Sequence, residues 1–165
     1  MEEYNEAKKL LRKALVINKN IFGEGHPHTA ATYFNLASVY SSLGEYDEAK
    51  DLHEKALMIR QKIFGEDHAD IASTYNNLAT VYSSLGEYNQ AKEFYEKALV
   101  IWKKNFGEEH DEVATGYNNL ASVYSSLGEY NDAKGLHEKA LIIRKTIFGE
   151  DHADIASSYN NLATV

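Results

Sequence analysis

The chain has 165 residues, with 17 Lys and Arg against 25 Asp and Glu, and a formal net charge of -8. Nucleic acids and anionic membrane surfaces are bound through clustered cationic side chains, so this charge balance argues against both kinds of partner. The sequence has no cysteine, which excludes disulfides, thiol catalysis and cysteine-ligated metals.

A 42-residue period orders the whole chain. The segment Ser-Ser-Leu-Gly-Glu-Tyr starts at Ser41, Ser83 and Ser125, and the pair Phe-Gly starts at Phe22, Phe64, Phe106 and Phe148. Repetition at this period is typical of stacked supersecondary units that share one continuous core. Such a chain offers a long ordered surface, which favours binding over catalysis at a single centre.

The period predicts one array over residues 1–165. It divides into a leading helix (1–22), full repeats (23–64, 65–106 and 107–148) and a truncated first helix (149–165). Because the chain starts and stops inside repeats, we expect it to be a fragment of a longer array. No apolar run approaches the roughly 18 residues of a membrane helix, and the first residues do not resemble a signal peptide. We therefore expect a cytoplasmic protein.

Each full repeat predicts two helices. In residues 65–106, apolar and small residues recur three and four apart from Ile71 to Leu85, and again from Tyr88 to Trp102. Gly86 follows the first stripe closely, where glycine commonly ends a helix. The predicted fold is all-α, a superhelical solenoid of antiparallel helix pairs.

The loops before the first helix of each repeat share the pattern Gly-Glu-x-His. The histidines are His26, His68, His110 and His152. Pro27 suits the first position of a helix, which makes His26 the predicted N-cap. One histidine per repeat is too widely spaced for a shared ion at bond lengths of about 2 Å, so we expect helix capping and no metal site.

The apolar pattern of one repeat resembles a known family. Tyr75-x-x-Leu78-Ala79-x-x-Tyr82, followed by Gly86-x-Tyr88-x-x-Ala91-x-x-x-Tyr95-x-x-Ala98, resembles the tetratricopeptide repeat. The longer period and the Phe-Gly-Glu-x-His loop resemble the kinesin-light-chain and nephrocystin type of this repeat. The resemblance implies a right-handed superhelix whose first helices line a concave groove for an extended peptide or a partner helix.

The resemblance also places groove residues on the first helix of each repeat. They are Phe34, Asn76, Asn118 and Asn160, then Ser38, Thr80, Ser122 and Thr164, then Ser41, Ser83 and Ser125. Asn both donates and accepts hydrogen bonds, so a ladder of exposed Asn would hold a peptide backbone with little regard for its sequence. Phe34 interrupts this ladder and predicts one apolar pocket. The alternative is that these residues form a plain solvated face.

The asparagines next to the groove positions are expected to have structural roles, and the groove positions themselves carry no charge. The adjacent Asn35, Asn77, Asn119 and Asn161 are expected to bond to backbone between helices, because buried amides need partners. The groove positions themselves carry no Lys or Arg, so the sequence does not predict a clamp for an acidic peptide.

Two functions remain open. The first is a non-enzymatic scaffold or adaptor that binds a protein or peptide and needs no cofactor, since no phosphate loop and no activated nucleophile are evident. The second is a structural spacer, or a self-assembling module, attached to another domain such as a signalling nucleotide hydrolase. The close likeness of the repeats favours this second interpretation. Residues 1–22 and 154–165 each lack a partner helix, which predicts head-to-tail self-association.

Overall fold

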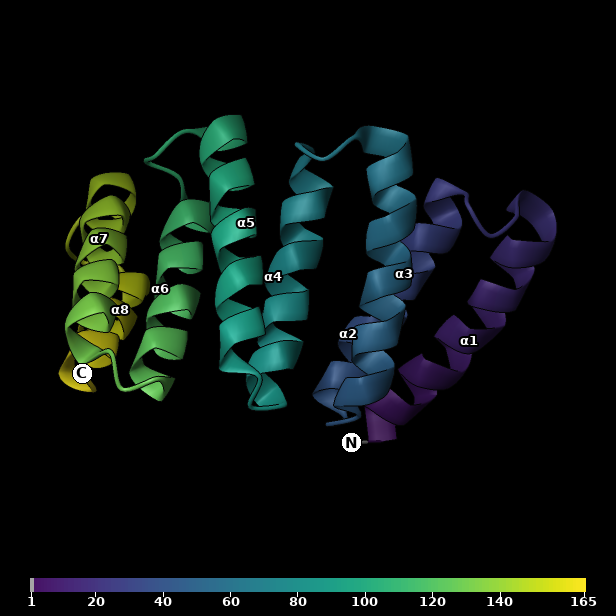
Figure 1. The fold of residues 1–165 in the computed structure, drawn as a ribbon, viewed down its shortest axis with the longest axis horizontal. Coiled ribbons are helices and arrows are strands. Elements are labelled where there is room, and N and C mark those ends of the chain that lie inside the picture. The colour runs from purple at the N-terminus through teal and green to yellow at the C-terminus, as the bar shows by residue number, and fades with distance from the viewer. Residues whose placement is uncertain (1) are drawn as a thin grey trace.

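The computed structural model describes residues 2–165, which form eight α-helices and no strands. The helices are α1 (Glu2–Phe22), α2 (Pro27–Ser42), α3 (Tyr46–Phe64), α4 (Ala69–Ser84), α5 (Tyr88–Phe106), α6 (Asp111–Ser126), α7 (Tyr130–Phe148) and α8 (Ala153–Ala163). They follow one another along the molecule, with α1 at one end and α7 and α8 at the other (Figure 1). The predicted all-α repeat superhelix is confirmed.

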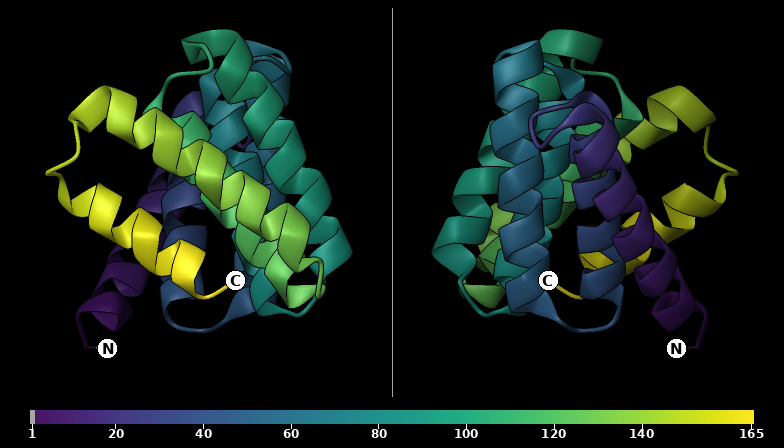
Figure 2. Two further views of the ribbon diagram at one scale, coloured as in Figure 1. Left: turned by 90° about the vertical axis from the view of Figure 1, so that its left-hand side faces the viewer. Right: turned by 90° about the vertical axis from the view of Figure 1, so that its right-hand side faces the viewer.

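The helices form two layers. Each helix packs against its neighbours in sequence, and α4 also contacts both α2 and α6 along the array. We call α2, α4, α6 and α8 the A helices, and α1, α3, α5 and α7 the B helices. In Figure 1, α3 lies in front of α2 and α7 in front of α8, and Figure 2 shows α7 and α8 running back alongside each other from their loop. A and B helices therefore present different faces to solvent.

The corner before each A helix is built by an aromatic ring and a histidine. Phe22 stacks on His26 with ring centroids 4.6 Å apart, and the three later Phe–His pairs stack in the same way. His26 also caps α2, because its Nδ1 accepts a hydrogen bond from the backbone N–H of His28 at 3.2 Å. His68 and His152 cap α4 and α8 similarly. His110 instead faces the Glu112 carboxylate at 2.5 Å.

Small side chains set the distance between helices. Ala37, Ala79 and Ala121 on the A helices are fully buried, and so are their partners on the B helices, Ala49, Ala56, Ala91, Ala98, Ala133 and Ala140. Tightly packed interiors have no room for extra methylene groups, so larger residues at these positions would force the helices apart.

One contact between neighbouring repeats is made by different residue pairs in different parts of the chain, and both members of the pair change together. Arg60 of α3 donates hydrogen bonds to the Thr74 hydroxyl at 2.7 Å and to the Asp70 carbonyl at 3.0 Å. One period later, Trp102 takes the place of arginine and Gly116 the place of threonine. A Cβ on Gly116 would lie 3.3 Å from the Trp102 ring and 3.1 Å from Leu99. The glycine thus makes room for the indole.

This pairing leads to a prediction about stability. Gly116→Thr is expected to lower the free energy of unfolding by about 1–3 kcal/mol, because the new side chain overpacks against Trp102. Adding Trp102→Arg recreates the Arg60–Thr74 arrangement, so the double variant should recover part of the loss. Urea denaturation of both single variants and the double variant, followed by circular dichroism, measures the coupling. A double variant at least as unstable as the sum of the two single effects would contradict the prediction.

Candidate functional site

The predicted groove residues lie together on the A helices. Ten of them are in α2, α4, α6 or α8, and Thr164 directly follows α8. Thr80 and Ser122 are exposed and Ser38 is half-buried. Each of these three hydroxyls donates to the backbone carbonyl one turn earlier, at 3.0–3.1 Å. The Ser38 and Ser122 oxygens can still accept hydrogen bonds from a ligand, whereas the Thr80 oxygen also lies 2.9 Å from the Tyr95 hydroxyl and has less capacity left.

The asparagines do not form the uniform exposed ladder that the sequence predicts. Asn118 is only 8% exposed, and its Oδ1 lies 2.7 Å from Nδ1 of His137 on α7. Asn76 is half-buried and accepts a hydrogen bond from Asn119 at 2.9 Å, whereas Asn160 is exposed. The difference arises because side chains from the next helix reach these amides. In the middle of the array, the asparagines link helices to one another.

The neighbouring asparagines, which were expected to bond to backbone groups between helices, have other partners. Asn119 bonds to a side chain of the preceding A helix rather than to backbone. Asn77 accepts a 3.5 Å contact from the adjacent Asn76, and Asn35 is exposed. The Asn119–Asn76 bond joins α6 to α4, so it fixes the spacing of the A helices where a ligand would lie.

The predicted apolar pocket at Phe34 is covered by two cationic or titratable side chains. His53 meets the Phe34 ring edge-on, with centroids 5.3 Å apart, and the Arg60 guanidinium lies 4.4 Å from the ring centroid. Arg60 is 9% exposed and makes no ion pair among the described residues. The sequence did not predict this cation near the groove, because Arg60 belongs to a B helix. The one hint is that the residue type at this position changes from repeat to repeat: Asn18, Arg60, Trp102 and Arg144.

Burial controls the titration of the histidines beside the groove. Burial, and secondarily the positive charge of Arg60, lower the pKa of His53 from its usual value of 6.5 to about 4. Burial also lowers the pKa of His137. Both rings are therefore neutral near pH 7. Nδ1 of His53 has no hydrogen-bond partner, so this ring acts as a packing group.

A cavity opens between the ends of α2 and α4 and the start of α3. Its volume is about 250 Å³, and it is lined by Ser41, Ser42, Tyr46, Thr80, Val81 and Ser84. The Ser41 hydroxyl is buried without a hydrogen-bond partner, and so is the hydroxyl of its counterpart Ser125. Buried polar groups are nearly always satisfied in folded proteins, so these two hydroxyls have hydrogen-bonding capacity that the protein itself does not use. Two predicted residues, Ser41 and Thr80, thus meet in one cavity.

Three other kinds of functional feature would be visible in the described residues: a metal site, a membrane-spanning helix and an activated serine. Residues 2–165 contain no cluster of three or more His, Cys, Asp or Glu side chains that could hold a metal ion. In the same range, no helix combines the length and apolar character needed to cross a bilayer. The unpartnered serines have neither a histidine nor a carboxylate bonded to them, so nothing activates them as nucleophiles.

The sequence matches a family model over its whole length. The model is described as Tetratricopeptide repeat, and it matches residues 1–62, 35–104, 70–146 and 112–165. The chain belongs to the tetratricopeptide repeat family. Among proteins with curated functions, none matches this sequence significantly.

Solved structures of similar fold include kinesin light chain-like repeat proteins. The crystal structure of BtubC (BKLC) from P. vanneervenii is 30% identical with a TM-score of 0.87, over 98% of this chain and 65% of that one. Two crystal structures of a putative kinesin light chain from Podosopora anserina, one of them a point variant, are 26% identical with TM-scores of 0.86 and 0.85. They are matched over 99% of this chain and 77% of theirs. The tetratricopeptide array thus spans just under two thirds of BtubC.

Membership of this family gives the general role of the groove. Tetratricopeptide repeats mediate protein–protein interaction, and kinesin light chain-like arrays are typically non-catalytic scaffolds. The A-helix surface with its cavity is therefore the candidate site for a protein partner.

The buried histidine predicts a specific pH dependence of stability. Between about pH 6.5 and 4 the unfolded chain takes up a proton at His53, whereas the folded protein does not. The free energy of unfolding should therefore fall as pH decreases through this window, by roughly 2–3 kcal/mol from this group. His53→Leu, which copies the counterpart Leu11, removes that contribution. Urea denaturation at pH 7 and pH 4.5 should show a smaller loss in the variant, and an equal loss would contradict the prediction.

Proposed function

We propose that this tetratricopeptide array is a non-enzymatic scaffold that binds a peptide segment of a partner protein across its A helices. The observation that carries the proposal is the cavity between α2 and α4, where the buried Ser41 hydroxyl has no partner. Thr80 borders the same cavity, and Ser122 offers an exposed acceptor one repeat further on. These groups suit the backbone N–H groups of an extended chain.

The contacts of the asparagines refine this proposal. Asn76 and Asn118 already bond to Asn119 and His137, so they support the floor of the groove. Recognition is then carried by hydroxyls and by the cavity wall rather than by an amide ladder. Arg60 lies beside Phe34 and makes no ion pair among the described residues, although the negative charge of Asp70 acts on it from nearby. It adds one positive charge near the N-terminal end of the groove.

Filling the cavity tests the proposal. Peptides are selected from a random display library on the parent chain, and their binding to Ser42→Gln/Ser84→Gln is then measured by fluorescence anisotropy. The longer neutral side chains should occupy the cavity and weaken binding about tenfold or more, equivalent to at least ~1.4 kcal/mol. Gln is also a better helix former than Ser, so the helices should remain folded.

The matched control carries the same kind of change away from the cavity. Asn20→Gln/Asn89→Gln lengthens two exposed side chains on B helices. This control should bind the selected peptides as the parent does. Equal binding by the cavity-filling variant would remove the A-helix cavity as the site.

A second candidate function is head-to-tail self-association, which two exposed apolar faces favour. Leu10 and Ile17 of α1 are 56% and 55% exposed, whereas Ile59, the counterpart of Ile17, is 9% exposed. Tyr159 of α8 is 51% exposed, although its counterpart Tyr33 is 3% exposed. We infer that α8 of one copy packs on α1 of the next, which forms an open chain because the two surfaces differ.

Self-association is tested by sedimentation velocity over a range of protein concentrations. The parent chain should show a mass that rises with concentration, because each contact buries apolar surface on both faces. Leu10→Lys blocks the α1 face and Tyr159→Lys blocks the α8 face, so each variant alone should remain monomeric. In an equimolar mixture, the one intact face of each variant should allow dimers and nothing larger. A parent chain that stays monomeric at the highest concentration would exclude this second function.

A further inference from the structure

One position on every B helix holds an exposed aliphatic side chain. The residues are Val16, Met58, Val100 and Ile142, which are 59%, 55%, 66% and 64% exposed. They are counterparts at the 42-residue period. Val and Ile are poorer helix formers than the Lys, Glu and Gln that occupy most exposed helix positions, so helix propensity does not explain them. Single exposed apolar residues are common, so the repetition becomes informative only where these side chains border cavities.

Two of these side chains border open cavities on the B-helix face. The first cavity has a volume of about 410 Å³, and its lining includes Glu66, Asp67, Tyr75, Glu96, Lys97 and Val100. The second has a volume of about 280 Å³, and its lining includes Glu108, Glu109, Tyr117, Lys139 and Ile142. The two are equivalent, since Tyr75 and Val100 lie one period before Tyr117 and Ile142. We call the two cavities together the B-helix site.

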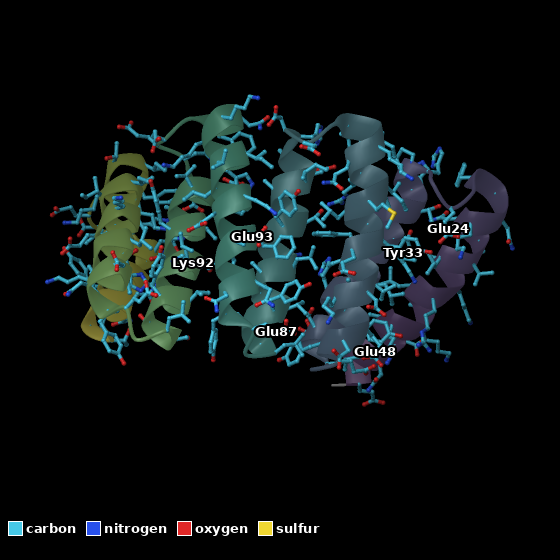
Figure 3. The ribbon with its side chains drawn as sticks, in the orientation of Figure 1. Glu24, Tyr33, Glu48, Glu87, Lys92 and Glu93 are labelled. Atoms are coloured by element: carbon cyan, nitrogen blue, oxygen red, sulfur yellow. The ribbon has the colours of Figure 1, made fainter. Side chains whose placement is uncertain are left out.

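The counterpart of Tyr75 and Tyr117 in the first repeat, Tyr33, has a different hydrogen-bond partner. The Tyr33 hydroxyl donates to the Glu24 carboxylate, and Glu24 also pairs with Lys19 at 2.7 Å. Glu24 and Tyr33 lie close together near the α1–α2 end of the array (Figure 3). In the next repeat, Gln61 takes the place of the lysine and donates instead to the Tyr75 hydroxyl at 3.2 Å. This exchange leaves Glu66 without an ion pair.

The charges left unpaired at the B-helix site are mainly negative. Lys97 pairs with Glu93 at 2.5 Å, Lys104 pairs with Asp67 at 2.5 Å, and Lys103 pairs with Glu108 at 3.1 Å. In the described chain, no ion pair involves Glu66, Glu96 or Glu109. The remaining lysine, Lys139, lies 5.6 Å from the centroid of the Tyr117 ring. A ligand with positive charges would complement this rim.

We propose that the B-helix site binds a basic amphipathic segment of a partner protein. Apolar side chains of the segment enter the two cavities against Val100 and Ile142, and its Lys or Arg side chains pair with Glu66, Glu96 and Glu109. The rings of Tyr75 and Tyr117 already face lysines of the array, so the basic residues of the segment pair with the carboxylates. Because this site shares no lining residue with the cavity at Ser41 and Thr80, its partner is separate from the peptide in the A-helix groove. One array then holds two partners at once.

A selection with matched variants tests the B-helix site. Random peptides are displayed against the parent chain, against Val100→Gln/Ile142→Gln, and against the groove-filling Ser42→Gln/Ser84→Gln. Peptides that combine apolar with Lys or Arg residues should be enriched on the parent and on the groove-filling variant. They should be lost at least tenfold on Val100→Gln/Ile142→Gln. Gln favours helix more than Val or Ile, so thermal unfolding by circular dichroism should show an intact fold.

The charge requirement is checked on one enriched peptide by fluorescence anisotropy. Glu66→Gln/Glu109→Gln should weaken its binding several-fold, and added salt should weaken binding to the parent more than to this variant. Replacing the basic residues of the peptide with Glu should abolish binding. If no enriched peptide depends on Val100 and Ile142, or if the dependent peptides lack basic residues, the proposal is overturned. Peptides lost only on the groove-filling variant belong to the A-helix groove, and the B-helix proposal is overturned if they are the only peptides enriched.

Discussion

Close approach of helices at buried alanines is the constraint on which this structure depends. Ala79 of α4 and Ala91 of α5 have no exposed surface, and both belong to the same packed cluster as Tyr95 and Leu120. No helix in such an array buries its apolar stripe alone, so each pair relies on the next for stability. The alanines fix the layers, and everything on the two faces is positioned by them.

Variation between repeats falls on the residues that these contacts leave adjustable. The position occupied by Arg60 and Trp102 changes together with that of Thr74 and Gly116, so one interface accepts either a polar bond or an indole. Next to it, Phe34 packs against His53, while one repeat later the Thr80 hydroxyl lies 2.9 Å from that of Tyr95. The local chemistry of the A-helix face thus differs from repeat to repeat although the backbone does not.

The two faces differ in a way that fits two kinds of partner. The A-helix face carries hydroxyls and a small cavity with an unpartnered serine, which suits a peptide backbone. The B-helix face carries exposed aliphatic residues above tyrosines with an acidic rim, which suits a basic amphipathic segment. A tetratricopeptide array with both properties would act as a connector, because its rigid core keeps the two surfaces at a fixed separation.

The sequence by itself determined the features that are local and repeated. The period, the helix positions, the histidine caps and the glycines at helix ends follow from short-range patterns that recur in each unit, and so does the family. Only the tertiary structure decided which polar groups are free. The Asn118–His137 and Asn119–Asn76 contacts join residues 19 and 43 apart, and they occupy amides that the sequence left exposed. The cavities at Ser41 and Val100 likewise depend on how neighbouring helices pack, which periodicity along one helix does not encode.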